Sequence, residues 1–177
     1  VALTREIPGA IAPILSPDRD PLAPQTATTA AFYSISNCQR GLAGVSFGNF
    51  LIKQVVEEIS REHKKLSTFV TLSPVPDFAA WLNRERKTEN SRVLTDADRA
   101  TLANLDKPQW WQSPQAGEAV QEPLVRAAAW YFLHARNARG SPVDSVARFH
   151  LGNGARLERI NYLADTGEKG ISQACGL

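Results

Sequence analysis

The chain has 177 residues, of which 43% are hydrophobic and 21% are charged. These proportions fit one globular domain with its own core and exclude a largely disordered chain. The 20 Lys and Arg residues nearly balance the 18 Asp and Glu residues. A net charge of +2, with basic residues scattered among acidic ones, argues against a nucleic-acid-binding protein.

The cysteine content and the apolar pattern narrow the cellular setting. Cys38 and Cys175 are too few and too far apart in sequence for a metal-ligand pair or a disulfide framework, which suits a reducing compartment. Because the sequence has neither a membrane-spanning apolar stretch nor a signal-peptide pattern, we expect a soluble protein that is not secreted. The absence of methionine indicates a processed product or a part of a longer chain.

The first part of the chain predicts a βαβ unit. Residues 1–4 form a short expected strand, followed by a helical or turn segment and a loop rich in Pro and Thr. Alternating side chains predict a strand over Ala30–Cys38. Apolar residues at helical spacing predict a helix from Gly48, and β-branched residues bounded by proline predict a second strand over Leu66–Ser73.

A glycine-containing stretch, QRGLAGVSFGNFLIKQ at residues 39–54, joins the first strand to this helix. Glycine lets a backbone approach a ligand closely, and a helix N-terminus offers unpaired N–H groups and a partial positive charge. The stretch is therefore a candidate anion site at the carboxyl end of the first strand. Its spacing matches neither the P-loop nor the dinucleotide fingerprint. The alternative is a helix entry whose glycines only relieve crowding.

The middle of the chain, about residues 77–139, is predicted to be mostly helical, with an interruption at Lys107–Gly117. Within LTDADRATL, Thr95 or Asp96 is the expected N-cap. The segment EPLVRAAAWYFLHAR is a strong helix former, and Pro123 is expected near its first turn.

The last part of the chain changes character. Residues 145–165, SVARFHLGNGARLERINYLAD, contain two apolar runs separated by Gly-Asn-Gly at 152–154. Asn-Gly is the strongest short-range signal for a β-hairpin. We therefore expect a hairpin here, with His150 beside its turn.

Outside the glycine stretch, Ser73 and His150 are the candidate chemical groups. Ser73 lies where a strand meets two prolines, and the alternative is an ordinary turn or N-cap serine. His150 lies among apolar residues, where a lone histidine is more often structural. His63 and His134 are weaker candidates, and three scattered histidines without paired carboxylates do not make a metal site.

Three long blocks of the sequence carry a family resemblance. They are FYSISNCQRGLAGVSFGNFLIKQVV (Phe32–Val56), TFVTLSPVPDFAAWL (Thr68–Leu82) and FHLGNGARLERINYLAD (Phe149–Asp165). With the similar C-terminal GISQACGL, they cover well over a third of the chain. In this order they resemble the catalytic domain of the malonyl-CoA decarboxylase family, whereas Arg84–Val146 carries little of the resemblance.

The resemblance implies an α/β fold with a mixed (α+β) sheet, like that of the GCN5-related N-acetyltransferases. Its parts would be a βαβ unit that binds CoA, a helical insertion and a C-terminal β-hairpin. The anion at the glycine stretch would then be the diphosphate of malonyl-CoA, next to the N-terminus of the helix. The residues expected to hold it through their backbone are Ala43, Gly44, Val45, Ser46, Phe47, Gly48 and Asn49.

The activity implied by the resemblance is decarboxylation of malonyl-CoA to acetyl-CoA and CO2. Loss of CO2 leaves an enolate on the thioester, so the site must stabilise the thioester oxygen and deliver a proton to carbon. By resemblance Ser73 hydrogen-bonds the malonyl group and takes part in proton transfer, and His150 donates to the enolate. Ser34 is a further candidate for holding the carboxylate or the thioester oxygen. The thioester is its own electron sink, so neither a metal nor an organic cofactor is expected.

The family also implies a wider context. Its members carry an N-terminal helical domain used in self-association and continue after the equivalent of CGL. Residues 1–177 are therefore expected to be a single catalytic domain, a fragment without those parts, from a homo-oligomeric protein. Its partners would be malonyl-CoA and acetyl-CoA, with no nucleic acid and no membrane. The expected location is the cytoplasm in bacteria, or the mitochondrial matrix, peroxisome or cytosol in eukaryotes.

Three other functions are open at this point. A CoA-dependent acyltransferase would use the same loop but would need a general base, and the sequence offers no clear carboxylate for that role. A serine hydrolase built on Ser73 and His150 lacks the G-x-S-x-G elbow, and the proline after Ser73 removes an N–H from the oxyanion hole. A non-catalytic module would bind CoA without turnover.

Overall fold

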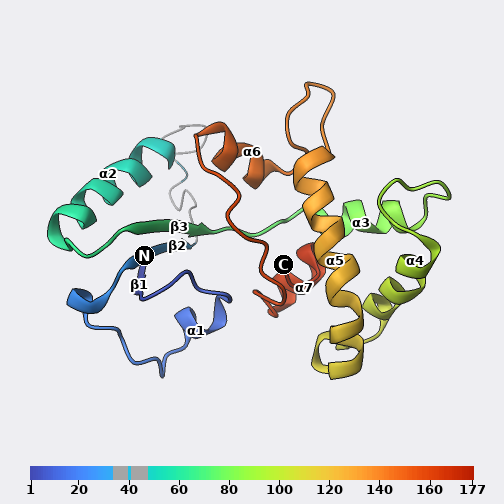
Figure 1. The fold of residues 1–177 in the computed structure, drawn as a ribbon, viewed down its shortest axis with the longest axis horizontal. Helices are drawn as coiled ribbons and strands as arrows, with labels where there is room; N and C mark the ends of the chain where they lie inside the picture. Colours follow the sequence, from blue (N-terminus) through green and yellow to red (C-terminus); the bar gives the residue numbers. More distant parts are fainter. Residues whose placement is uncertain (34–39, 41–47) are drawn as a thin grey trace. The chain divides into compact units, whose positions relative to one another are not determined.

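The computed structural model describes residues 1–33, 40 and 48–177. Contacts divide the chain into two compact units, Val1–Ser73 and Pro74–Leu177, and each has its own hydrophobic cluster (Figure 1). Within the described part of the chain, no helix is long and apolar enough to cross a membrane.

The first unit is built on a three-stranded mixed sheet of order β1-β2-β3. Strand β1 (Ala2–Thr4) pairs antiparallel with β2 (Thr29–Tyr33). Strand β2 pairs parallel with β3 (Thr68–Leu72), and the register places Tyr33 opposite Leu72. The two parallel strands therefore end at the same edge of the sheet.

Helix α2 (Gly48–Glu62) connects these parallel strands (Figure 1). One helical stripe is apolar and the other carries charged side chains, so burying the stripe on the sheet removes it from water. The cluster formed with the β2 residues Ala30 and Phe32 includes four side chains of α2: Ile52, Val55, Val56 and Ile59. The predicted βαβ unit is thus confirmed. Of the strand predicted over Ala30–Cys38, the part after Tyr33 lies outside the described residues.

A short helix, α1 (Ala12–Leu15), and a 3-10 turn (Pro24–Thr26) lie in the connection from β1 to β2. Both begin with a proline in their first turn, where the missing N–H has no helical partner to lose. The predicted helical or turn segment after the first strand is confirmed.

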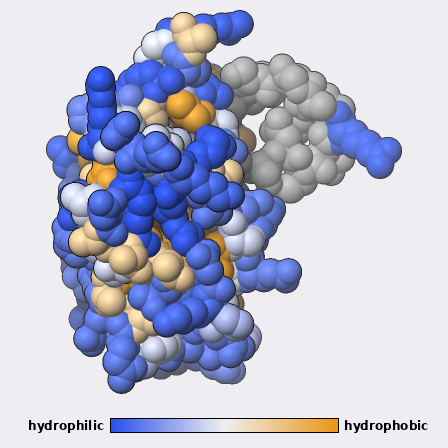
Figure 2. All heavy atoms as spheres, turned by 90° about the vertical axis from the view of Figure 1, so that its right-hand side faces the viewer, coloured by the Kyte–Doolittle hydropathy of each residue, from blue (hydrophilic) through white to orange (hydrophobic). Residues whose placement is uncertain are grey.

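The second unit is helical. Its core joins the aromatic rings of Phe78, Trp81 and Tyr131, with the Trp81 and Tyr131 centroids 4.9 Å apart. The side of the molecule that carries α4 is largely hydrophilic, as expected of helices whose apolar stripes face a core (Figure 2). The helices are α3 (Phe78–Arg86), α4 (Asp96–Leu102), α5 (Pro114–His134), α6 (Ser145–Gly152) and α7 (Glu168–Ala174), with 3-10 turns at Ala103–Asp106 and Trp110–Gln112.

The predicted start of the longest helix is wrong. Helix α5 begins at Pro114, with Ser113 as N-cap, so Pro123 lies inside the helix and not near its first turn. The ring of Pro123 removes one backbone hydrogen bond. The apolar stripe nevertheless continues through this position, because Val120, Leu124 and the buried proline itself pack into the core. Burial of that stripe outweighs the local cost.

The predicted C-terminal β-hairpin is also wrong. Residues Ser145–Gly152 form α6, and residues 155–165, all of them described, contain no strand. The Gly-Asn-Gly segment closes this helix, because the N–H groups of Asn153 and Ala155 donate to the His150 carbonyl at 3.1 and 3.0 Å. Gly154 adopts a positive φ of 88°, which glycine allows at a helix end. A helix end and a hairpin turn use the same residue types.

Helix α7 approaches the turn before it very closely at Gly170. A Cβ atom at this position would lie 2.4 Å from the carbonyl oxygen of Asp165 and 2.5 Å from its Cγ. The same two segments are joined by a hydrogen bond from the N–H of Asp165 to the carbonyl of Gly176, at 3.3 Å. Only glycine fits at position 170 without a shift of the backbone.

Candidate active site

Ser73 lies at the carboxyl edge of the parallel strands. It directly follows Leu72, the last residue of β3, whose register partner Tyr33 is the last residue of β2. Its side chain is exposed there. In α/β units this edge is where ligands bind, because the strand ends and the helix N-termini meet there. The other strand-end candidate, Ser34, lies outside the described residues.

The N-terminus of α2 lies at the same edge of the first unit, because the helix runs back along the sheet from the end of β2 to the start of β3 (Figure 1). Its first N–H groups have no partner within the helix, and its first turn holds no acidic side chain. Of the predicted CoA-binding residues, Gly48 and Asn49 open this helix. The others, Ala43, Gly44, Val45, Ser46 and Phe47, lie outside the described residues.

Two large apolar side chains stand in solvent next to this helix start. Phe50 and Leu51 are 63% and 56% exposed, whereas the apolar side chains further along α2 pack on the sheet. An exposed apolar pair beside a helix N-terminus offers one surface to an anion and another to an apolar ligand segment.

His150 lies in the last turn of α6, in the second unit. Its ring is half-buried and meets the ring of Phe149 edge to face, with the centroids 5.1 Å apart. Burial lowers the pKa of the imidazole below its ordinary value, because desolvation disfavours the charged form. Ser73 and the start of α2 thus share one edge of the first unit, and His150 belongs to the second.

Asp144 is a buried carboxylate that the sequence analysis missed. It is 2% exposed and is the N-cap of α6, where its Oδ1 accepts a hydrogen bond from the N–H of Ala147 at 2.8 Å. Burial raises its pKa, and the nearby Asp77 carboxylate acts in the same direction. The signal was present in the sequence: an Asp before a helical pattern is a typical N-cap.

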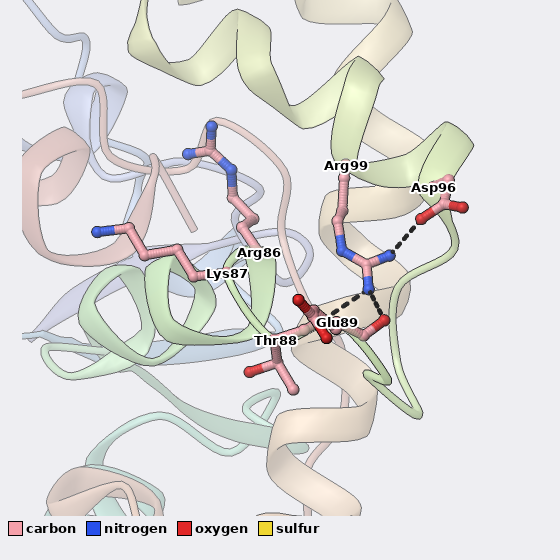
Figure 3. A pocket seen from close by; sticks show the side chains of 6 residues that line it. All are labelled: Arg86, Lys87, Thr88, Glu89, Asp96 and Arg99. Atoms are coloured by element: carbon pink, nitrogen blue, oxygen red, sulfur yellow. Dashed lines mark hydrogen bonds and ion pairs between the residues drawn. The ribbon is translucent and has the colours of Figure 1, made fainter.

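A hollow lies in the helical unit, between the end of α3 and the start of α4 (Figure 3). Its guanidinium groups already have partners. Arg99 donates to the carbonyls of Thr88 and Glu89 at 2.7 and 2.8 Å, and to Asp96 at 3.0 Å. Arg86 pairs with Asp106. These hydrogen bonds and ion pairs hold the α3–α4 connection in place, which favours a structural role for the hollow.

The remaining candidate ligands and nucleophiles are few. Among the residues described in the structure, no three His, Cys, Asp or Glu side chains gather as metal ligands. Burial raises the pKa of the Cys175 thiol to about 11, so the reactive thiolate is disfavoured.

Comparison with known proteins identifies the family. The model of the malonyl-CoA decarboxylase C-terminal domain matches residues 1–177. The chain belongs to this family. Among curated malonyl-CoA decarboxylases, the mitochondrial proteins of Anser anser anser and Rattus norvegicus are 38% and 36% identical to it. Both match all of this chain, which spans 39% and 40% of their lengths.

Solved structures of malonyl-CoA decarboxylases share the fold. Those from Rhodopseudomonas palustris and Agrobacterium vitis are each 54% identical to this chain, with TM-scores of 0.92 and 0.93 over 99% of it. The chain covers 40% and 43% of those two structures. The Cupriavidus metallidurans protein is 36% identical, with a TM-score of 0.70. The resemblance to the family and the mixed α/β fold class are both confirmed.

Proposed function

We propose that this domain decarboxylates malonyl-CoA to acetyl-CoA and CO2, without a metal or an organic cofactor. The observation that carries the proposal is the edge of the βαβ unit where Ser73 and the N-terminus of α2 lie together. This edge has the features needed to hold an anionic acyl-CoA, and the chain matches the malonyl-CoA decarboxylase domain along its whole length.

The CoA part of the substrate would bind at the start of α2. The backbone from Ala43 to Asn49 would hold the diphosphate, and the absence of acidic side chains from the first turn leaves the positive end of the helix dipole uncompensated. Phe50 and Leu51 would cover the less polar pantetheine arm. Binding would remove these exposed side chains from water, which favours the complex.

The chemistry would be divided among three side chains. When the bond to the carboxylate breaks, its electron pair enters the thioester as an enolate and CO2 leaves. Ser73 and Ser34 would hydrogen-bond the malonyl carboxylate and the thioester oxygen, and His150 would give a proton to the enolate carbon. Because burial lowers its pKa, a protonated His150 would be a stronger acid than an ordinary histidine.

Release of CO2 and acetyl-CoA in metal-free buffer tests the proposal. The assay would use the chain and the full-length natural protein, each with His150→Ala and with His134→Ala as a matched control. His134 is an exposed histidine in the last turn of α5, in the same unit. Loss of a proton donor should lower kcat by about 100-fold or more.

The control variant should retain kcat within a factor of about two, and CoA binding should change little in either variant, because His150 is proposed to act on the malonyl group and His134 has no proposed role. If the full-length protein binds CoA and releases no CO2, a non-catalytic module or an acyltransferase replaces the proposal. Self-association of the full protein through a helical domain stays a prediction.

A further inference from the structure

We propose that Asp144 is a positioning residue for His150. Its buried carboxylate fixes the N-terminus of α6 in the helical unit and so sets where the far end of this helix carries the imidazole. The inference rests on the role proposed for His150, and nothing in the family resemblance pointed to Asp144.

Helix α6 depends on its N-terminus for its position. None of its residues, Ser145–Gly152, is fully buried, whereas Asp144 immediately before it is 2% exposed. His150 comes six positions after Asp144 in the sequence, which corresponds to about 9 Å along a helix axis. A tilt of about 10° at the cap would therefore move the histidine by roughly 1.5 Å, a displacement of the size that can cost an enzyme about 100-fold in rate.

Groups from three segments of the helical unit lie close to this carboxylate. Its Oδ1 accepts from the N–H of Ala147 in α6. Tyr131 of α5 has a raised pKa, for which burial is the first cause and the charge of Asp144 the next. Asp77, the residue before α3, helps to raise the pKa of Asp144. The start of α6 thus lies near Tyr131 and Asp77.

The chain leading into Asp144 is held as well. The N–H of Val143 donates to the carbonyl of Ala135 at 3.2 Å, and Arg136 and Pro142 form a β-bridge. From α6, Arg148 reaches back to the carbonyl of Pro142 at 2.7 Å. These contacts hold the segment before α6, and the Asp144 cap and Arg148 both join α6 to that segment.

The choice of residue is unusual for a simple cap. Asp144 Oδ2 and the Tyr131 hydroxyl are both buried, and neither has a partner at hydrogen-bond geometry within the described chain. A buried carboxylate oxygen without a partner is costly, and a serine or asparagine would cap a helix nearly as well. The burial of this carboxylate therefore has a cost in stability, while its Oδ1 still caps α6.

The test uses Asp144→Ala, Asp144→Asn and Thr95→Ala in the full-length protein. Thr95 is the N-cap of α4 in the same unit, so its loss removes a comparable cap far from His150 in sequence. Two quantities are measured: kcat and KM for CO2 release, and the NMR titration of the His150 imidazole, assigned by its absence in His150→Ala.

We expect Asp144→Ala to lower kcat by about tenfold or more with little change in KM, since the chemical step depends on geometry. The pKa of His150 should rise toward its ordinary value as the ring gains solvent. Asp144→Asn should restore kcat to within about threefold, because its amide oxygen can still cap the helix. Thr95→Ala should change neither quantity.

An unchanged kcat and an unchanged His150 titration in Asp144→Ala would overturn the inference, as would an equal loss in Thr95→Ala. If Asp144→Ala does not fold, Asp144→Gln keeps a polar side chain that is not a preferred N-cap, and the same two outcomes apply to it. If the unmodified protein releases no CO2, the proposed function fails. The titration still decides whether Asp144 positions His150.

Discussion

Two buried aspartates in the helical unit differ in the hydrogen-bond and ion-pair partners of their carboxylates. Asp98, 9% exposed, lies in the first turn of α4, where Thr95 donates to it through its N–H and its hydroxyl at 2.8 and 2.7 Å. The Arg126 guanidinium donates a further hydrogen bond to Asp98 Oδ1 at 2.5 Å. Asp144, 2% exposed, caps α6, and within the described residues no Lys, Arg or His side chain pairs with it.

The pKa values move in opposite directions. Burial pushes the pKa of Asp98 up, but the hydrogen bonds from Thr95 and Arg126 outweigh it and hold the pKa below the ordinary value. For Asp144, burial dominates and the pKa is raised. A fully satisfied carboxylate strengthens a fold, whereas an incompletely satisfied one is tolerated where its position serves another purpose.

Removal of the cation should make Asp98 resemble Asp144. We expect Arg126→Leu to lower the free energy of unfolding by about 2 kcal/mol at pH 7, below the full cost of breaking a buried pair, because the Arg126 side chain is 45% exposed. Urea unfolding followed by tryptophan fluorescence measures this, since Trp81, Trp110, Trp111 and Trp130 are the four tryptophans of the chain and all lie in the helical unit.

The matched control for that experiment is Arg156→Leu, which removes an exposed pair with Glu158 and should change stability by less than about 0.5 kcal/mol. In Arg126→Leu the pKa of Asp98 should rise relative to the unmodified protein, because Arg126 helps to lower it. The stability that the lowered pKa supplies above the ordinary Asp value should then shrink. An equal loss of unfolding free energy in Arg126→Leu and Arg156→Leu would show that the Arg126–Asp98 pair stabilises the fold no more than an exposed pair does.

The cap at Thr95 should account for the next largest effect. Its hydroxyl accepts from the N–H of Asp98 at 3.1 Å, while the Asp98 carboxylate accepts from the N–H of Thr95. Thr95→Ala should cost about 1 kcal/mol by the same unfolding measurement. Thr95→Ser keeps the hydroxyl and should cost only a few tenths, so equal losses in the two variants would rule out the capping bond as the cause.

The βαβ unit and the N-cap of α4 could be predicted from the sequence. The βαβ unit followed from the strand predicted over Ala30–Cys38, whose described part lies in β2, and from the helical spacing of apolar residues in α2. The N-cap at Thr95 followed from a residue type that competes for backbone N–H groups. These features depend on neighbours within a few residues, so local sequence is enough to predict them.

The site was harder to predict because it depends on distant partners. Gly-Asn-Gly at 152–154 ends a helix here, although the same residues favour hairpin turns, and only the Asp144 cap distinguishes the two. The electrostatic link of Asp144 to Tyr131 and Asp77 joins residues far apart in the chain. The predicted roles of Ser73, His150 and Ser34 came from family resemblance, and they stay predictions.

A smaller effect should come from the charge of Asp144. Because its folded-state pKa is raised, its contribution to stability is present below the ordinary Asp pKa and is lost as pH rises through the folded value. The unfolding free energy of the unmodified protein, minus that of Asp144→Asn, should therefore decline from acidic to neutral pH. Contributions of Asp98 and Asp106, whose pKa values are lowered, cancel in this difference. A difference that rises with pH would mean that the pKa of Asp144 is lowered, as that of Asp98 is, and would contradict the contrast between the two aspartates.

The smallest effect is expected at Tyr131. Its hydroxyl is buried without a hydrogen-bond partner in the described chain, so Tyr131→Phe should change stability by less than about 0.5 kcal/mol. The matched control is Tyr162→Phe, whose hydroxyl donates to the Gly117 carbonyl at 2.7 Å and should cost about 1 kcal/mol. A larger loss at Tyr131 than at Tyr162 would show that the Tyr131 hydroxyl bonds to Asp144.

The close approach at Gly170 limits which residues this position can tolerate. Even an alanine there would force the backbone of α7 away from Asp165, although the position carries no chemical group. In a cell, such a variant would populate its unfolded state more and be degraded by quality control. The cell would then hold less of this protein, although no group with a proposed role in the chemistry had been changed.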